Sequence, residues 1–188
     1  MNDSIILMGI KHSGKSTQGR LLAKSLACSF VDVDDVIAEI AGQTPREIYT
    51  LHGEGSFMKW EEEACRRMAT ENVQKRLVIA TGGGICDNAP ALQVLRSMGR
   101  FIFLNVAENI AVNRILNKAC LGEDGSWLGL PAYIAKENPQ DESDIRAIFH
   151  EFYVKRIAVY SKIADIKIDI SDKTKDENAR LIAKAIGA

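Results

Sequence analysis

The sequence lacks a long apolar run and an excess of charge of either sign. Its longest apolar runs, at residues 4–10 and 77–80, are far shorter than the roughly 20 residues that span a bilayer. Lys and Arg number 24 against 25 Asp and Glu, so no overall positive field attracts a polyanion. We therefore expect neither a membrane nor a nucleic acid as a partner.

The cysteines lack the close spacing that is typical of a zinc site or a disulfide framework. Cys28, Cys65, Cys86 and Cys120 show no CxxC spacing, which argues against both a zinc site and a disulfide framework. The first residues do not resemble a signal peptide, because their apolar run is short and leads into the polar residues 11–15. We expect a cytoplasmic monomer with reduced cysteines.

What is present is the pattern of an α/β protein. At 188 residues, 46% of them hydrophobic, the chain is long enough for one buried core and too short for two ordinary domains. Short apolar runs alternate with amphipathic stretches, which predicts βαβ units and a parallel sheet with helices on both faces. The predicted strands are residues 5–8, 29–33, 77–80, 100–105 and 164–170. The firmest helices are residues 15–27, 61–70, 107–117, 144–161 and 175–186.

Residues 118–143 differ from the rest of the chain. They gather glycines, acidic residues, Pro131 and Pro139 around a few apolar side chains, including Trp127 and Tyr133. This composition is typical of a mobile lid or an insertion.

The strongest motif is Gly9-Ile10-Lys11-His12-Ser13-Gly14-Lys15-Ser16, which fits GxxxxGK[ST] between a predicted strand and a predicted helix. Backbone amides of such a loop cradle phosphates, while Lys15 reaches the β- and γ-phosphates and Ser16 ligates Mg²⁺. The alternative is a glycine-rich turn with a chance Lys-Ser. His12 could contact phosphate, but a variable, solvent-facing loop position is the commoner explanation for a histidine there. The predicted ATP-binding residues here are Gly9, Lys11, His12, Ser13, Gly14, Lys15, Ser16 and Thr17.

Carboxylates follow the second predicted strand. The period of two puts Asp32 and Asp34 on one strand face, at the carboxyl edge where doubly wound sheets bind ligands. One carboxylate can hold metal-bound water, and the other can orient an acceptor hydroxyl for in-line attack. The alternative is structural, an N-terminal cap followed by acidic residues in the first helical turn, and Asp35 fits that role better.

A third glycine cluster, Gly82-Gly83-Gly84, follows the strand at residues 77–80. Together with the phosphate loop, Phe30-x-Asp32-x-Asp34, Gly53-Glu54 to Phe57 and Glu61-Glu62, it resembles the shikimate kinase family in order and spacing over residues 4–116. The later segment 156–160 is similar to the family's Arg-x-Pro-x-Tyr element, with alanine in place of proline.

The resemblance implies a P-loop three-layer α/β/α fold with a five-stranded parallel sheet. In a single domain spanning residues 1–188 it implies a helical substrate-binding segment at about residues 33–62 and a lid at about 118–143. It also implies an enzyme that moves the γ-phosphoryl group of ATP, with Mg²⁺, to a hydroxyl of shikimate.

The resemblance further implies roles for single residues. Lys15 and Asp34 would be catalytic, with Asp34 on the shikimate hydroxyls and Asp32 in the outer shell of the metal beside Ser16. Arg114 would lie near the adenine side of the nucleotide. The residues implied to line or support the acceptor site are Asp34, Met58, Glu61, Gly82, Gly83, Gly84 and Arg156, the last pairing with the substrate carboxylate. Arg114 and Glu61 are equally compatible with solvated helix charges.

Two cations of the family pattern are missing. Met58 occupies the position of an arginine that binds the shikimate carboxylate, and methionine cannot replace its charge-assisted hydrogen bonds, a loss on the order of 2 kcal/mol. Lys59 points elsewhere on a helix. The lid segment contains no arginine, and Lys118, Lys136 or Arg146 would have to stand in.

These departures leave two rivals to a shikimate kinase. One is a P-loop kinase for a different small hydroxyl compound, since Met58 makes that wall of the pocket less cationic. The other is a non-catalytic nucleotide-binding paralogue that retains the ATP site without phosphoryl transfer.

Overall fold

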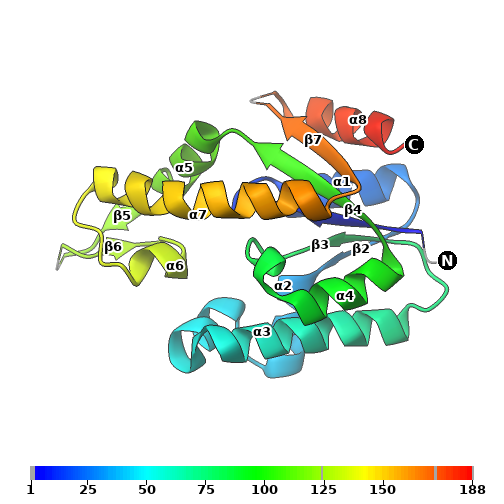
Figure 1. Cartoon of the computed structure of the whole chain (residues 1–188), viewed down its shortest axis with the longest axis horizontal. Helices are drawn as coiled ribbons and strands as arrows, with labels where there is room; N and C mark the ends of the chain where they lie inside the picture. Colours follow the sequence, from blue (N-terminus) through cyan, green and yellow to red (C-terminus); the bar gives the residue numbers. More distant parts are fainter. Residues whose placement is uncertain (1–2, 124, 172, 188) are drawn as a thin grey trace.

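The protein, described by a computed structural model over residues 3–123, 125–171 and 173–187, is built around a five-stranded parallel sheet (Figure 1). The strand order is β2-β3-β1-β4-β7, so the chain starts in the middle and crosses over to both edges. The strands of this sheet are β1 Ser4–Met8, β2 Ser29–Asp32, β3 Leu77–Ala80, β4 Gly99–Val106 and β7 Ile166–Ile170.

Helices cover both faces of the sheet. Helices α1 and α8 pack together on one side, while α4 and α7 contact β4 on the other and α3 packs on α4 (Figure 1). The main helices are α1 Lys15–Ser25, α2 Val33–Ala41, α3 Pro45–Glu71, α4 Ala89–Met98, α5 Glu108–Leu116, α7 Glu142–Ile163 and α8 Lys175–Ala185. The short 3-10 helix η1 spans Ile85–Asp87.

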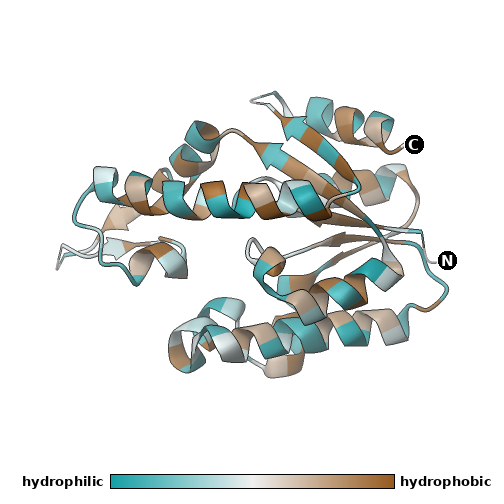
Figure 2. Cartoon of the chain, viewed as in Figure 1, coloured by the Kyte–Doolittle hydropathy of each residue, from teal (hydrophilic) through white to brown (hydrophobic). Residues whose placement is uncertain are grey.

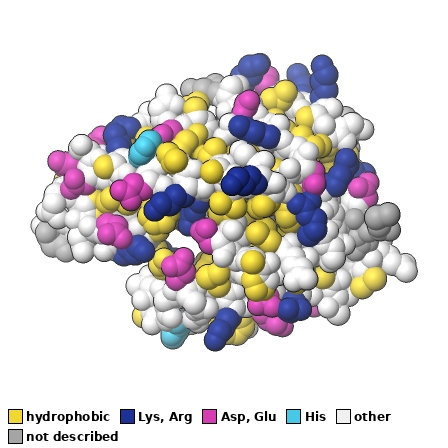
Figure 3. Space-filling view, in the orientation of Figure 1, with side chains coloured by type: hydrophobic (Ala, Val, Ile, Leu, Met, Phe, Trp, Pro, Cys, Tyr) yellow, Lys and Arg dark blue, Asp and Glu magenta, His cyan; other side chains and the backbone are white. Residues whose placement is uncertain are grey.

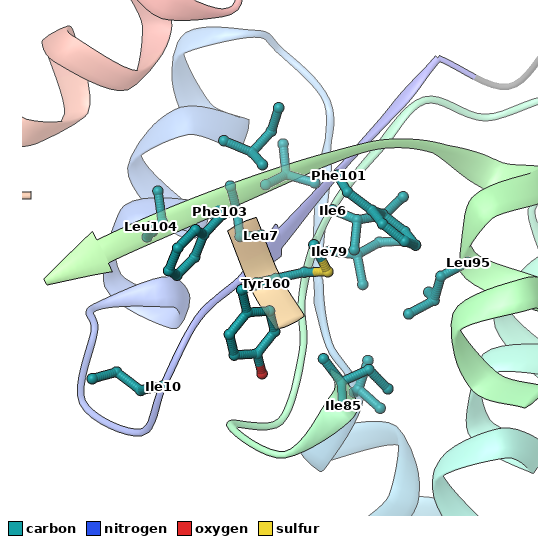
Figure 4. Close-up of a cluster of buried hydrophobic side chains, with 14 of the residues drawn as sticks. Ile6, Leu7, Ile10, Ile79, Ile85, Leu95, Phe101, Phe103, Leu104 and Tyr160 are labelled. Carbon is teal, nitrogen blue, oxygen red and sulfur yellow. The ribbon is translucent and has the colours of Figure 1, made fainter. Parts of the chain in front are cut away.

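The hydrophobic core lies along the central strands. All residues of β1 are buried, because this strand has a neighbour on each side and helices on both faces. Hydropathy colouring shows the central strands mostly brown, whereas the helices around them carry both brown and teal residues (Figure 2). Within the core, the ring of Tyr160 stacks on the ring of Phe103, with centroids 5.2 Å apart. Ile85 lies near the Tyr160 ring, away from Phe103 (Figure 4).

The five predicted strands are confirmed, with shifted ends. The largest shift lies at residues 164–170, because β7 begins only at Ile166. At residues 29–33 the shift is one residue, because β2 ends at Asp32 and Val33 begins α2. The prediction that Asp32 and Asp34 share a strand face is therefore wrong. Asp32 is instead the N-cap of α2, and its side chain accepts a hydrogen bond from the Asp34 amide at 3.2 Å. The structural alternative applies to Asp32, which caps the helix whose first turn carries Asp34.

Helices α3 and α7 extend beyond the predicted ranges, whereas α1, α5 and α8 end slightly inside them. The periodic pattern predicts α3 only over residues 61–70, and the resemblance adds a helical segment at about 33–62. A capping box between Thr44 and Glu47 and a proline in the first turn start the helix at Pro45. Helix α4 was not predicted, although Asn88 caps it and Pro90 stands in its first turn. Both helices carry start signals that lie outside the strongly periodic apolar stretches.

Helix α3 is interrupted at Gly53. This residue has φ 79° and ψ 174°, a backbone conformation that is nearly confined to glycine. The break separates a short N-terminal arm, residues 45–52, from the long arm that packs on α4. The two arms can therefore face the same cavity from different directions.

The predicted lid segment has secondary structure of its own. Strands β5 Cys120–Leu121 and β6 Trp127–Leu128 pair as an antiparallel hairpin, and helix α6 Ala132–Ala135 follows. Leu130 and Ile134 are buried and anchor this segment to the core. Over the part of the chain that is described, no helix is long and apolar enough to cross a bilayer.

Candidate active site

Two cavities meet at the carboxyl edge of the sheet, where ligands of open α/β sheets bind. The phosphate cavity, of about 340 Å³, is lined by the P-loop, and the acceptor cavity, of about 220 Å³, lies between α3, η1 and the lid. Four residues line both cavities: Lys11, Asp34, Gly82 and Gly83. In the space-filling view a hollow rimmed by acidic and basic side chains separates the lid from the end of α3 (Figure 3).

The P-loop buries its lysine between β1 and α1. The Lys15 ammonium group donates to the carbonyls of Gly9 and Ile10 at 2.8 and 2.9 Å. Burial lowers the pKa of Lys15 to about 8, although the negative charges of Asp34 and Asp32 oppose the shift. A phosphate at the mouth of this loop would raise that pKa again and hold the ammonium charge.

The two predicted metal ligands are in direct contact. The Ser16 hydroxyl donates to Asp32 Oδ2 at 2.6 Å, at the start of α1 and the end of β2. A hydroxyl and a carboxylate beside a phosphate cavity fit Mg²⁺, which takes few protein oxygens and completes its shell with water and phosphate. No group of three or more acidic, His or Cys side chains suitable for a metal occurs in the described chain.

Asp34 faces the junction of the two cavities from the first turn of α2. Burial raises the pKa of its carboxyl, and the neighbouring charge of Asp32 raises it further, whereas Lys15 and Lys11 oppose the shift. A carboxylate with a raised pKa accepts a proton more readily than an ordinary aspartate. This placement suits a group that orients and deprotonates an acceptor hydroxyl.

Other cations surround the phosphate cavity. Arg114 donates to the His12 carbonyl at 3.0 Å, so it braces the P-loop and is not a free helix charge. His12 and Lys118 both line the cavity. Burial, together with the positive charges of Lys118 and Lys11, lowers the pKa of His12 to about 4, so the His12 imidazole is neutral at pH 7.

Glu61 is a buried carboxyl beside the glycine cluster. It is 1% exposed and accepts a hydrogen bond from Asn88 Nδ2 at 2.9 Å, while its other oxygen, Oε1, has no partner among the described residues. Burial raises the pKa of Glu61 to about 7. The same Asn88 amide donates to the Met58 carbonyl at 2.8 Å, so Glu61 belongs to a structural network and is not a solvated charge.

The glycine cluster allows the P-loop and the acceptor cavity to approach each other. A Cβ on Gly83 would lie 2.7 Å from the Lys11 amide nitrogen, closer than real Cβ atoms come. The Tyr160 hydroxyl donates to the Gly83 carbonyl at 3.2 Å, which ties this turn to the core. Gly82 and Gly84 similarly leave room for Glu61 and Arg156.

Arg156 reaches the acceptor cavity from α7. Its guanidinium pairs with Asp87 Oδ2 at 3.2 Å and lies over the rings of Tyr133 and Phe152 at 5.1 and 5.2 Å from their centroids. Tyr133 belongs to the lid, so this one cation connects α7, η1 and the lid. Arg156 belongs to the family resemblance in the sequence, whereas Asp87 carries no motif.

Met58, at the position where the family pattern has an arginine, lines the acceptor cavity. The three possible substitutes for the lid arginine lie in different places. Lys118 lines the phosphate cavity, and Lys136 lines the acceptor cavity. Arg146 pairs with Glu142 and lines neither cavity. Lining residues that sequence reasoning missed are Pro45, Arg46, Tyr49, Asp87 and Phe152. The first three lie within the helical substrate-binding segment that the resemblance implies at about residues 33–62, but no motif singles them out.

A glycine-rich loop between β1 and α1, a buried lysine and an adjoining acceptor cavity define a P-loop kinase. A family model for shikimate kinase matches residues 11–187. The chain is 35% identical to a shikimate kinase of Moorella thermoacetica over 100% of this chain and 96% of that one, and 33% identical to one of Thermodesulfovibrio yellowstonii over 96% and 93%. The chain belongs to the shikimate kinase family.

The fold agrees with that assignment. The shikimate kinase of Acinetobacter baumannii, solved in complex with shikimate, is similar with a TM-score of 0.79 and 26% identity, over 98% of this chain and 92% of that one. The family members are ATP-dependent kinases that phosphorylate a small hydroxyl compound, and this chain is an enzyme of that class.

Proposed function

We propose that this protein transfers the γ-phosphoryl group of ATP to a hydroxyl of shikimate. The observation that carries the proposal is the junction of the two cavities, which Asp34 and Lys11 line together. ATP phosphates in one cavity and a hydroxyl in the other would meet beside these two side chains. Such positioning supplies most of the catalysis in phosphoryl transfer.

The reaction assigns a task to each group at the junction. The acceptor oxygen forms a bond to the γ-phosphorus as the bond to the β-phosphate oxygen breaks, and ADP leaves. Asp34 takes the hydroxyl proton, and its raised pKa favours this transfer. Lys15 turns from the Gly9 and Ile10 carbonyls to the β- and γ-phosphates.

Mg²⁺ fits beside Ser16 and Asp32, whose oxygens are 2.6 Å apart. When bound, the ion neutralises negative charge on the phosphates during transfer. Ser16 would be its direct ligand, and Asp32 would hold the water of its outer shell while capping α2.

Lys118 is the cation that we propose for the missing lid arginine. It follows α5, lines the phosphate cavity and lies close enough to Lys11 and His12 to lower the pKa of each. A lysine offers a point charge and not a planar fork, so it can neutralise the transferring phosphoryl group with less geometric control.

A coupled ADP-release assay with MgATP, with and without shikimate, tests the function. Shikimate-dependent turnover is expected for the wild type and none for Lys15→Ala. Asp34→Asn should still bind ATP but lose about a hundredfold or more in kcat, because the proton acceptor at the junction is gone. A wild-type rate in Asp34→Asn would refute the role given to this carboxylate.

A second candidate function is phosphorylation of an uncharged hydroxyl compound. It is favoured by Met58 and by Asp87, which already neutralises Arg156 in the acceptor cavity. In the same assay, turnover with neutral polyols but not with shikimate would select this function.

A further inference from the structure

Four cations line the acceptor cavity: Lys11, Arg46, Lys136 and Arg156. In the proposed function the acceptor carries a carboxylate, which needs at least one of these charges when it leaves water. Which of these cations is free to bind that carboxylate depends on the acidic groups of the protein beside each cation.

Three of the four cations have an acidic neighbour. Arg156 pairs with Asp87 at 3.2 Å, and Lys136 is 3.9 Å from the Glu137 carboxylate. Lys11 lies in the field of Asp34, the acidic charge that most strongly opposes the lowering of its pKa. The charges of these cations are therefore already partly or fully balanced within the protein.

Arg46 forms none of the ion pairs found among the described residues. The nearest acidic residue in sequence, Glu47, is occupied by the capping box, where it accepts from the Thr44 amide and hydroxyl at 2.7 and 2.8 Å. Arg46 is close enough to Lys11 for its positive charge to lower the pKa of Lys11. Its guanidinium thus adds to this cavity a positive charge that no ion pair among the described residues engages, although Glu54 lines the same cavity.

The Gly53 break brings Arg46 to the same cavity as Met58. Arg46 and Tyr49 are one turn apart on the N-terminal arm of α3, whereas Met58 lies on the long arm. All three line the acceptor cavity, so a cation on one arm can serve a ligand that contacts the apolar side chain on the other. An arginine at either position could present two parallel N–H donors to a carboxylate.

We infer that Arg46 binds the carboxylate of the acceptor and is a specificity-determining residue that takes the place of a cation at Met58. This inference rests on the proposed function.

The test is Arg46→Met, assayed with shikimate and with an analogue whose carboxylate is replaced by a hydroxymethyl group. For shikimate, KM is expected to rise about tenfold to a hundredfold, the effect of losing hydrogen bonds to a charged group, while kcat and the KM for ATP stay close to wild type. For the uncharged analogue, wild type and variant should have the same KM. Introducing Met58→Arg into Arg46→Met should restore the KM for shikimate.

Lys59→Met is the matched control, because it removes an exposed cation of α3 that lines neither cavity. An unchanged KM for shikimate in Arg46→Met, with an active wild type, overturns the inference and leaves the proposed function standing. An equal rise of KM for the uncharged analogue also overturns it, because the loss would then be structural. A wild type without shikimate-dependent turnover overturns both.

Discussion

Glu61 is a carboxyl of the acceptor region whose ionisation is strongly altered by burial. Its pKa of about 7 in the folded protein lies above the ordinary value of 4.5, so burial favours the protonated form. The contribution of the protonated Glu61 side chain to the stability of the fold is fully present below about pH 4.5, and it is lost as the pH rises through 7. The difference between these two pKa values corresponds to about 3 kcal/mol.

Glu61→Gln, which keeps a neutral side chain of the same shape, is therefore expected to gain stability over the wild type as the pH rises. Urea unfolding at pH 4.5 and pH 8 should show the difference in free energy of unfolding changing by about 3 kcal/mol in favour of the variant. Glu63→Gln, at an exposed position of the same helix, should show no such change. A difference that does not vary with pH would contradict the buried, uncharged state of Glu61.

At the scale of elements, the broken helix α3 determines the shape of the acceptor cavity. Its two arms carry different parts of the lining, with Arg46 and Tyr49 on one and Met58 and Glu61 on the other. The cavity therefore depends on a single residue, Gly53, whose backbone conformation other residues rarely adopt.

Gly53→Ala is expected to destabilise the protein by about 1–3 kcal/mol or to displace the N-terminal arm of α3. In either case the KM for shikimate should rise while the KM for ATP stays the same, because the phosphate cavity has no lining residue from α3. Unfolding free energies and both KM values measure these effects.

Gly55→Ala is the control for the kink. Gly55 lies in the same helix without a positive φ, and a Cβ there would have no neighbour within 4 Å. Alanine should stabilise the helix by about 0.5–1 kcal/mol and leave both KM values unchanged. Similar losses in the two variants would mean that the break at Gly53 is not what shapes the cavity.

At the scale of the whole molecule, the nucleotide site joins both halves of the sheet. The P-loop follows β1, Asp32 ends β2, and Arg114 comes from α5, beyond β4, to brace the loop through the His12 carbonyl. A ligand that binds this site only in the folded state raises the free energy of unfolding of the entire domain.

MgATP at a hundred times its Kd should therefore stabilise the protein by about 2.7 kcal/mol. Chelation of Mg²⁺ by EDTA should reduce this gain, because Ser16 and Asp32 would lose the ion that connects them to the phosphates. Lys15→Ala should reduce it further. Thermal unfolding with and without each ligand measures the gain, and a gain that survives both changes would place the nucleotide elsewhere.

The sequence by itself determined the nucleotide half of the site. The motif from Gly9 to Ser16 has a fixed spacing because its chemistry is local: a strand, a loop of amides and a helix start follow one another along the chain. The alternating apolar runs likewise predicted the five strands, since burial on both faces leaves a direct mark on composition. The error at Asp34 arose because a strand end and a helix start have similar short-range patterns.

The tertiary structure alone decided which cations line the acceptor cavity. The sequence could name Lys118, Lys136 and Arg146 as possible substitutes, but only the fold separates them between two cavities and the surface. Asp87 and Arg46 carry no motif, because their importance comes from the approach of η1 to α7 and from the break in α3. Charge pairing depends on distances between segments far apart in the chain, and such distances are fixed by packing rather than by local spacing.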